Sequence, residues 1–390
     1  MKVLFINSRP NAAQIPGGDT VQMWKSREAL DKLGVDVESV GAEALEGPLP
    51  ACDLAHLFNL QDAQPAWALM ERLQKAGIPV VLSPIYWDMT PFWYENASTG
   101  SGPWARITRL LGKRVTANLY SRWQRTKAPG SGAWRSQRRL LQTAQRVQPN
   151  SRSETALLRR LFGLGRGFEA KVDVVPNAVD PILEGKAAGG ESIARRLEYR
   201  DFILEVGTIY PVKNQLGLIE ALFDLPVPIV FVGQMMEAYA DYAAACRSAA
   251  SRRGNVIFLE HLPHEQLPEV YRSAAVHALP SWRETPGLVS LEAAAAGCKI
   301  VSTSIGSARD YFGDEAWYCH PSDPASIRTA VEVALAAPRT PALEQRVKKE
   351  FTWERTAEAM LASYRKVLHA RPQAAPFVMT GRKPTPAGRA

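Results

Sequence analysis

Disulfide chemistry has little support in this sequence, because only four cysteines occur among 390 residues and no two lie at Cys-x-x-Cys spacing. Such sparse usage is typical of reduced thiols and predicts a cytoplasmic protein. A signal peptide is not expected, since the apolar run after Lys2 is too short for one. The sequence contains no run of about 18 apolar residues, so no membrane-spanning helix is predicted. The cysteines are Cys52, Cys246, Cys298 and Cys319.

Signals for a metal site are also weak. The six histidines, which include His261 and His264, lack cysteines or carboxylates at ligand spacing. No Asp-x-Asp-like cluster lies near the motifs described below. We therefore expect no metal ion and no resident cofactor, and we interpret the histidines as structural or exposed.

Acidic residues are absent from residues 96–153, although twelve lysines and arginines occur there. This exceeds the net charge of +8 of the whole chain, so the remainder of the chain is net acidic. The positive charge is thus concentrated in one basic insertion. Its basic residues are Arg106, Arg109, Lys113, Arg114, Arg122, Arg125, Lys127, Arg135, Arg138, Arg139, Arg146 and Arg152.

An amphipathic pattern accompanies this charge. Trp104, Ile107, Leu111, Val115 and Leu119 recur at helical spacing, which predicts an apolar helix face beside a basic one. A basic amphipathic helix with a tryptophan suits the surface of an anionic membrane. A merely solvated insertion is one alternative. A nucleic-acid surface is the other and the least favoured, because no recognised nucleic-acid-binding module accompanies the charge.

Two domains are expected, since the chain exceeds the roughly 250–300 residues at which a single core stops growing. Short apolar runs alternate with helical stretches in both halves. Most runs are apolar throughout, which indicates parallel strands buried on both faces and hence doubly wound α/β domains. Such domains bind ligands at the carboxyl ends of their strands. The expected strands span residues 2–7, 35–40, 54–59 and 79–86, and then 202–206, 228–232, 256–259, 276–279 and 299–303.

The most informative motif is a pair of glutamates, Glu284 and Glu292, with seven residues between them. Thr285 suits the N-cap of a helix, Pro286 suits its first position, and Gly297 closes it. Glu284 then precedes the helix, while Glu292 lies inside it with a side chain that leans toward the helix start. The free amides of that start would bind an anion between two carboxylates, which suits a pyrophosphate flanked by two sugars. Two solvated surface charges are the alternative.

This stretch resembles the E-x7-E signature of glycosyltransferase family 4. The resemblance includes residues 278–281, residues 287–293 and the pair at 296–297. It implies the GT-B fold, in which two Rossmann-like domains face each other across a cleft. It also implies that Glu284 binds hydroxyls of the donor sugar and that Glu292 binds the ribose. Pro286 stands where the commonest family form has phenylalanine, a change that a helix start tolerates.

Further family landmarks follow in order along residues 1–370. Gly17 and Gly18 resemble the family's glycine loop, where the lack of a Cβ lets the backbone approach a ligand. An ordinary strand-to-helix turn is the alternative there. Residues 174–180 resemble the segment that leaves the first domain, and residues 206–214 resemble the loop after the first strand of the second. The resemblance implies donor binding by Gly17, Gly18, Gly207, Thr208, Lys213, Asn214, Glu284, Pro286, Gly287, Leu288, Val289 and Glu292.

The chain departs from the family at the expected diphosphate clamp. Thr208 stands where many members have an arginine, so the clamp would rest on Lys213 and the helix-start amides. Arg283 and Arg309 are further candidate cations. A solvated loop lysine is the alternative interpretation of Lys213.

A second departure lies in residues 85–94, which concentrate five aromatic side chains after an apolar strand. By position they resemble the acceptor side of the first domain, and aromatic faces stack on sugar rings. We therefore expect Tyr86 and Trp87 to bind the acceptor, with core packing as the alternative. Many family members have a histidine here, and Asp88 is the nearest polar substitute. The candidate catalytic residues are Glu284, Lys213 and Asp88.

The resemblance implies a retaining hexosyltransferase of the EC 2.4 class that moves a sugar from a nucleoside diphosphate sugar to a lipid-linked or cell-surface polysaccharide of a bacterial envelope. An anionic membrane is the expected partner, with the protein peripheral on the cytoplasmic face of the inner membrane. A non-catalytic homologue that acts as a membrane-associated scaffold or nucleotide-sugar-binding protein is the alternative. Two carboxylates also suit a glycoside hydrolase, but the adjacent helix start favours phosphate.

The expected organisation follows from these landmarks. Residues 1–179 would form the N-terminal acceptor-side domain, with the basic insertion at 96–153. Residues 180–351 would form the C-terminal nucleotide-sugar-binding domain. A helix at 352–370 would return to the N-terminal domain, and the Pro- and Gly-rich tail at 371–390 is expected to be disordered.

Overall fold

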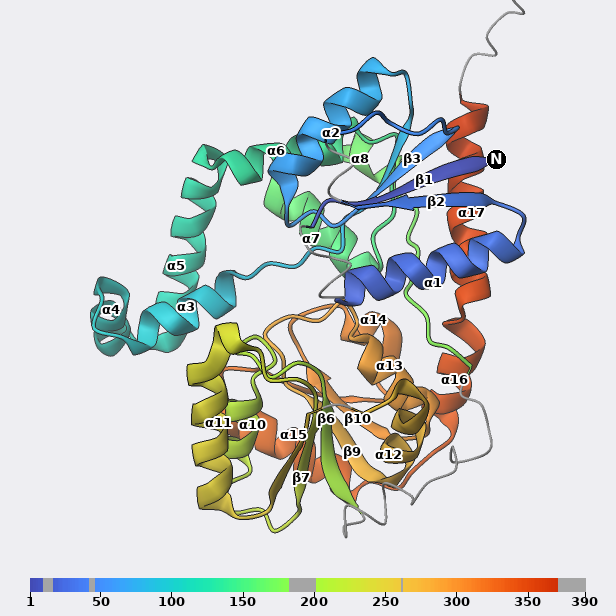
Figure 1. Ribbon diagram of the computed structural model, residues 1–390. Coiled ribbons are helices and arrows are strands. Elements are labelled where there is room, and N and C mark those ends of the chain that lie inside the picture. Colours follow the sequence, from blue (N-terminus) through green and yellow to red (C-terminus); the bar gives the residue numbers. More distant parts are fainter. Residues whose placement is uncertain (10–16, 42–45, 182–200, 261, 371–390) are drawn as a thin grey trace, which may run out of the picture.

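A computed structural model describes residues 1–9, 17–41, 46–181, 201–260 and 262–370. Two separate parallel sheets organise the chain, one in each half of the view in Figure 1. The expected α/β architecture with two Rossmann-like domains is confirmed. The predicted disordered tail and His261 lie outside the described residues.

The N-terminal sheet has the strand order β2-β1-β3-β4-β5, and every neighbouring pair is parallel. Its central strands are almost entirely buried, which explains their mostly apolar sequence. The strands are β1 (Lys2–Asn7), β2 (Asp36–Val40), β3 (Leu54–Phe58), β4 (Val80–Ser83) and β5 (Arg146–Val147). The helices that pack around this sheet are α1 (Gly18–Lys32), α2 (Ala63–Lys75), α6 (Gly132–Thr143), α7 (Arg152–Phe162) and α8 (Arg166–Glu169).

The C-terminal sheet has the order β11-β10-β9-β6-β7-β8 and is likewise parallel. One face packs against α12, α13 and α16, and the other packs against α10, α11 and α15. The strands are β6 (Phe202–Val206), β7 (Ile229–Val232), β8 (Val256–Leu259), β9 (Ala274–Leu279), β10 (Lys299–Thr303) and β11 (Trp317–Cys319). The helices are α10 (Gln215–Ala221), α11 (Ala240–Arg253), α12 (Leu267–Ser273), α13 (Leu288–Ala295), α14 (Ala308–Phe312), α15 (Pro324–Ala336) and α16 (Ala342–Glu350).

Helices of the basic insertion, together with the helix just before it, project from the N-terminal domain (Figure 1). They are α3 (Thr90–Thr99), α4 (Pro103–Leu111) and α5 (Lys113–Lys127). The single amphipathic helix expected from Trp104 to Leu119 is wrong, because Gly112 has a φ of 78° and separates α4 from α5. Trp104 consequently packs its ring on Tyr120, with ring centroids 5.0 Å apart, instead of facing outward.

The last helix, α17 (Trp353–His369), packs against the N-terminal domain beside α1 (Figure 1). Its Tyr364 hydroxyl lies 2.6 Å from Nδ1 of His56, a fully buried residue of β3. Burial lowers the pKa of His56 to about 3, so the imidazole is neutral at pH 7. The Thr356 hydroxyl donates to the carbonyl of Pro176 at 2.9 Å. Helix α17 thus contacts and stabilises the segment that connects the two domains.

The domains also touch directly. The Tyr311 hydroxyl of α14 donates to the carbonyl of Asn150 at 2.6 Å and accepts from the amide of Asn177 at 2.9 Å. The carboxylate of Asp310 accepts from the amide and the hydroxyl of Ser153 at 2.8 and 2.7 Å. These bonds hold the start of α7 against the C-terminal domain.

Candidate functional site

An ion pair joins two loops that follow neighbouring strands of the C-terminal sheet. Lys213 follows β6 and Glu284 follows β9, and Nζ of the lysine lies 2.6 Å from Oε1 of the glutamate. Both side chains are largely buried. Burial acts to lower the pKa of Lys213, but Glu284 and Tyr210 outweigh it and hold that pKa above its ordinary value. Lys213 therefore carries a positive charge at pH 7, and its interpretation as a solvated loop lysine is wrong.

The start of α13 lies directly beside this pair. Gly287 is the N-cap with a φ of 87°, a conformation that side chains disfavour, and a Cβ there would lie 3.0 Å from Oε2 of Glu284. The prediction of Thr285 as N-cap and Pro286 as first helical residue is therefore wrong, because the helix begins at Leu288. The amides of Leu288 and Val289 have no acceptor within the described part of the chain. They supply two donors next to a lysine.

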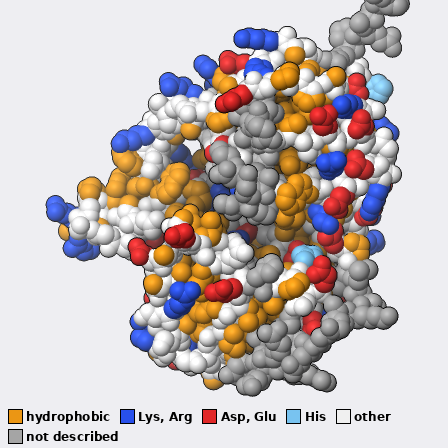
Figure 2. Space-filling model, viewed as in Figure 1, with side chains coloured by type: hydrophobic (Ala, Val, Ile, Leu, Met, Phe, Trp, Pro, Cys, Tyr) orange, Lys and Arg blue, Asp and Glu red, His pale blue; other side chains and the backbone are white. Residues whose placement is uncertain are grey.

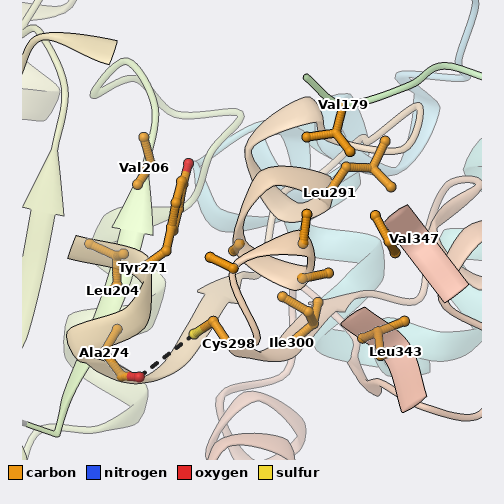
Figure 3. Close-up of a cluster of buried hydrophobic side chains, with 14 of the residues drawn as sticks. Val179, Leu204, Val206, Tyr271, Ala274, Leu291, Cys298, Ile300, Leu343 and Val347 are labelled. Carbon is orange, nitrogen blue, oxygen red and sulfur yellow. Dashed lines mark hydrogen bonds between the residues drawn. The ribbon is translucent and has the colours of Figure 1, made fainter. Parts of the chain in front are cut away.

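Glu292 lies on a different face of α13 from the core. Its neighbour Leu291 points into the core between Val179 and Val347 (Figure 3). Oε2 of Glu292 accepts from the Tyr271 hydroxyl at 2.9 Å, and Oε1 lies 3.4 Å from Nε2 of His264. The hydrogen bond with Glu292 raises the pKa of His264 above its ordinary value. The exposed His264 thus lies beside a candidate site residue.

The loop after β6 is held in place by Asn214. Its Nδ2 donates to the carbonyls of Pro280 and Pro321, at 3.2 and 2.9 Å. Asn214 therefore connects the loops that follow β6, β9 and β11. Gly207 lies under the aliphatic part of Lys213, since a Cβ at this glycine would lie 3.6 Å from the lysine Cε. Thr208 is half-buried in the same loop, and its carbonyl accepts from Gln215.

The expected glycine loop begins α1, with Gly17 as its N-cap and Gly18 as its first residue. Figure 1 shows α1 beginning on the side of its domain that faces the C-terminal domain. Next to the loop, the Asp19 carboxylate accepts from Asn7 and Asn59, at 3.1 and 3.0 Å. Arg9 also binds this carboxylate. These contacts fix the beginning of α1.

Glu154 holds the backbone of the aromatic segment after β4. This fully buried carboxylate accepts from the amides of Tyr86 and Asn150, both at 2.7 Å. Burial raises the pKa of Glu154 to about 7, although both hydrogen bonds act to lower it. Trp87 is almost buried, and Asp88 accepts from the amide of Thr90 at the start of α3. The ring of Tyr86 packs on Phe162 of the N-terminal core, with ring centroids 5.5 Å apart, and also lies within electrostatic range of Arg283.

The comparisons with known proteins agree with this geometry. Residues 193–350 match the family model described as "Glycosyl transferases group 1". The chain is 28% identical to D-inositol 3-phosphate glycosyltransferase of Gordonia bronchialis over 91% of this chain and 85% of that protein. These matches support assignment to a family 4-like group of glycosyltransferases. For the namesake from Segniliparus rotundus, at 29% identity, the alignment spans about half of the relative, 54% of its length.

Solved structures show the same fold as this chain. Sucrose-phosphate synthase from Thermosynechococcus elongatus superposes with a TM-score of 0.70 at 18% identity, covering 95% of this chain and all of that one. The Anabaena protein HepE, solved in complex with UDP, gives 0.65 at 17% identity over 94% of this chain. At these identities the likeness supports the GT-B fold alone.

The two further candidate cations, Arg309 and Arg283, have different neighbours. Arg309 pairs with Asp314 at 2.9 Å and lies over the ring of Tyr318, so its charge is already engaged. Arg283 is half-buried between Trp282 and Glu284 in the motif. A cavity of about 620 Å³ beside α7 is lined by other residues, among them Arg152 and Arg160, and includes none of the two-glutamate motif. The candidate site is therefore the ion pair with the helix start, and that cavity lies apart from it.

The sequence predicted the two glutamates and Lys213 but missed their aromatic neighbours. Trp282 is buried, and its ring contacts Phe92 of α3 with centroids 5.9 Å apart. Tyr271 reaches Glu292 from the helix before β9. Trp282 adjoins the motif and could have been noted, but no local pattern links Phe92 or Tyr271 to residues so distant in the chain.

Proposed function

We propose that this glycosyltransferase transfers a sugar from a nucleoside diphosphate sugar to a hydroxyl group of its acceptor. The observation that carries the proposal is the convergence of Lys213, Glu284 and the free amides of Leu288 and Val289. A lysine and a helix start together suit a diphosphate. Glu284 beside them suits the hydroxyls of the donor sugar, and Glu292 suits the ribose.

The chemistry follows from where charge develops. As the glycosidic bond to the leaving diphosphate breaks, negative charge grows on its oxygen, and Lys213 with the two amides would stabilise it. We propose that this oxygen takes the acceptor's proton on the same face of the sugar, so that the anomeric configuration is retained and no separate base is needed. The chain's main contribution is then to orient both substrates. No metal ion is proposed for this step.

We propose a lipid-linked or growing cell-surface glycan as the acceptor, bound on the N-terminal side near Tyr86 and Asp88. The basic insertion supports a position at an anionic membrane, on the cytoplasmic face of the inner membrane. In the described part of the chain no helix is long and apolar enough to cross a bilayer. A relative of 26% identity over 44% of this chain is named O-antigen chain mannosyltransferase B.

The second candidate function is a non-catalytic nucleotide-sugar-binding scaffold. Thr208 favours it, since it supplies no guanidinium to the diphosphate. The two candidates differ in turnover rather than in binding. A panel of UDP-, GDP- and ADP-sugars titrated into the protein by calorimetry, followed by detection of free nucleoside diphosphate with a glycan acceptor mixture, separates them.

We expect one donor to bind, and we expect Glu292→Ala and Lys213→Ala to weaken that binding at least about tenfold, as loss of a charged hydrogen bond does. Glu344→Ala, which removes a half-buried glutamate of α16 that pairs with Lys348 outside the site, is the matched control. Absence of heat with every donor in the panel would overturn the proposal. Binding without any release of nucleoside diphosphate would favour the scaffold.

A further inference from the structure

The turn between α4 and α5 exposes apolar side chains that a water-facing turn does not need. Leu110 is 83% exposed, and Leu111 and Val115 are 52% and 51% exposed. Arg109 and Arg114 flank them and are also exposed. Figure 2 shows hydrophobic side chains gathered over the projecting insertion, with lysines and arginines along its outer edge. We call Leu110, Leu111 and Val115 the apolar turn.

Aromatic packing between α4 and α5 holds this turn in place. The ring of Trp104 in α4 packs on Tyr120 and Trp123 of α5, with centroids 5.0 and 5.4 Å away. Nζ of Lys127 lies 4.0 Å from the centre of the Trp123 ring. Because aromatic packing fixes the hairpin, the apolar turn is presented without the entropy cost of ordering it.

The positive charge around the apolar turn indicates which kind of partner it binds. No acidic residue occurs from residue 96 to residue 153, so arginines around the apolar turn have no acidic neighbours within the insertion. Apolar tips that enter the headgroup region together with flanking arginines are the combination that binds an anionic bilayer. A protein partner or a second copy of this chain would have to supply acids around an apolar recess instead.

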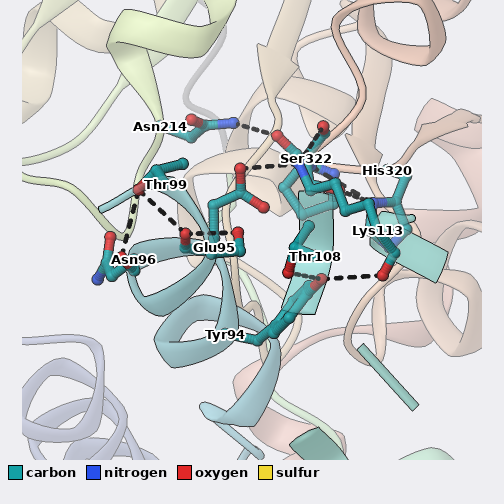
Figure 4. A network of polar contacts seen from close by, with 11 residues as sticks. Tyr94, Glu95, Asn96, Thr99, Thr108, Lys113, Asn214, His320 and Ser322 are labelled. Atoms are coloured by element: carbon teal, nitrogen blue, oxygen red, sulfur yellow. Dashed lines mark hydrogen bonds and ion pairs between the residues drawn. The ribbon is translucent and has the colours of Figure 1, made fainter. Parts of the chain in front are cut away.

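Lys113, which lies between Leu111 and Val115 of the apolar turn, contacts the C-terminal domain. Nζ of Lys113 lies 2.8 Å from Oε1 of Glu95 in α3 and 3.4 Å from the carbonyl of Ser322 (Figure 4). Ser322 belongs to the loop after β11, which Asn214 holds through the carbonyl of Pro321. Lys213 immediately precedes Asn214 in the chain. One polar network therefore extends from the apolar turn to the loop of the donor site.

A second contact reaches the same loops. Phe92 of α3 packs against Trp282, and the amide of Trp282 donates to the carbonyl of Val212 at 2.8 Å. Val212 and Trp282 lie near the two members of the ion pair, Lys213 and Glu284. The projecting helices thus contact the loops after both β9 and β11.

We propose that the insertion couples an anionic bilayer to the donor site: the apolar turn enters the bilayer, and Lys113 and Phe92 transmit its position to the loops around Lys213 and Glu284. The proposal rests on the donor site assigned above. A docked insertion is already ordered against the C-terminal domain, so donor binding loses less conformational freedom. Donor affinity therefore rises on the bilayer. By thermodynamic linkage, the donor strengthens bilayer binding by the same factor.

The test measures both affinities. Vesicle binding is followed by flotation with phosphatidylglycerol–phosphatidylcholine vesicles and with phosphatidylcholine vesicles alone, and nucleotide binding by titration of UDP or GDP with and without vesicles. We expect binding only to the anionic vesicles and a rise in nucleotide affinity of roughly fivefold, the lower end of typical coupling. We expect the nucleotide to raise vesicle affinity by an equal factor.

Three variants separate vesicle binding from its coupling to nucleotide binding. The double variant Leu110→Ser/Leu111→Ser should lose vesicle binding and keep its nucleotide affinity in solution. Phe92→Ala should still bind vesicles but lose the vesicle-induced gain in nucleotide affinity. Val333→Ser removes an exposed apolar side chain of α15, 48% exposed, and should change neither quantity.

Several results would overturn the coupling. These are unchanged nucleotide affinity with vesicles, full vesicle binding by the double leucine variant, or a change in its oligomeric state by light scattering without a change in vesicle binding. The last result would assign the turn to a second copy of the chain. Failure of the proposed function has a different signature, since no nucleotide would then bind even in the absence of vesicles.

Discussion

At the scale of single residues, the site depends on one buried charge being matched by another. Glu284 is only 6% exposed and its partner Lys213 is 19% exposed, so neither charge is well solvated by water. Removing one partner of such a pair leaves the other unpaired in a poorly solvated place. The pair therefore contributes to the fold of the C-terminal domain as well as to the proposed donor site.

Lys213→Met should lower the free energy of unfolding by roughly 3 kcal/mol, because it leaves Glu284 buried without a partner. Lys213→Arg should restore most of the stability but not all of the donor affinity, since the guanidinium is larger and planar. Urea unfolding followed by circular dichroism measures the first effect and donor titration the second. Equal stability of Lys213→Met and the wild-type protein would contradict the burial argument.

Glu154 gives a pH-dependent prediction. Its pKa rises from 4.5 in the unfolded chain to about 7 in the folded protein, so the folded state binds more protons between these values. The stabilisation from protonated Glu154 is fully present below pH 4.5 and is lost as the pH rises through about 7. The total change corresponds to roughly 3 kcal/mol.

The free energy of unfolding of the wild-type protein minus that of Glu154→Gln should therefore fall by up to that amount as the pH rises from 4.5 to 7. It should stay constant above pH 8. Denaturant titrations of both proteins at matched pH values measure it. A difference that grows with pH would mean that the folded protein stabilises the ionised carboxylate instead.

At this scale the sequence predicts candidate site residues because its signals are local. Spacing and the family resemblance predict Glu284, Glu292 and Lys213. The structure adds the pairing of Glu292 with Tyr271 and of Lys213 with Glu284, which depend on neighbouring strands β6 and β9. Strand order is a long-range property, and no local pattern in these segments specifies it.

At the scale of elements, the start of α13 places the amides that we propose to bind the diphosphate. Gly287 has a positive φ, and its hydrogen in place of a Cβ leaves room for Glu284 and Leu279. Thr285 and Pro286 have the composition of a helix start, yet the chain enters the helix later. The carbonyl of Thr285 accepts from Nδ2 of Asn177 at 3.3 Å instead. The tertiary contact with the connecting segment thus overrides the local capping signal.

Gly287→Ala should weaken donor binding and destabilise the protein by about 2 kcal/mol, through backbone strain plus the displacement of Glu284. Gly254→Ala is the matched control. Its φ of 89° is equally unfavourable, but a Cβ there meets nothing within 4 Å. Its cost should be about 1 kcal/mol, without an effect on donor affinity. Identical effects of the two changes on both quantities would contradict the role given to Gly287.

Other elements show where sequence patterns suffice and where they do not. The long apolar runs predicted β1, β6, β8 and β10 with correct bounds. The edge strands β5 and β11 have only two and three residues, too few for a recognisable pattern. Their pairing comes from the neighbouring strands β4 and β10.

At the scale of the whole molecule, the relative position of the two domains decides whether donor and acceptor meet. The Tyr311 hydroxyl binds both Asn150 and Asn177, and Lys25 of α1 pairs with Asp180 at 3.0 Å. Phe92 and Lys113 add contacts from the insertion. These contacts involve few residues, so single substitutions can alter the balance between closed and open arrangements.

Tyr311→Phe removes the shared hydroxyl and leaves the aromatic packing intact. We expect a loss of about 1–2 kcal/mol in the contact between the domains, because the buried amide of Asn177 loses its acceptor. The radius of gyration from small-angle scattering should rise. Tyr364→Phe, which removes a hydroxyl between α17 and His56 inside the N-terminal domain, is the control and should leave the radius unchanged. Equal radii for all three proteins would show that the hydroxyl of Tyr311 does not set the domain arrangement.

The most direct test of the central claim is a crystal structure of the chain with the nucleoside diphosphate sugar that it binds. The account predicts density for the diphosphate against the amides of Leu288 and Val289, within reach of Lys213, with Glu284 and Glu292 at the sugar and the ribose. Density for the diphosphate at any other place, such as the cavity beside α7, would contradict it.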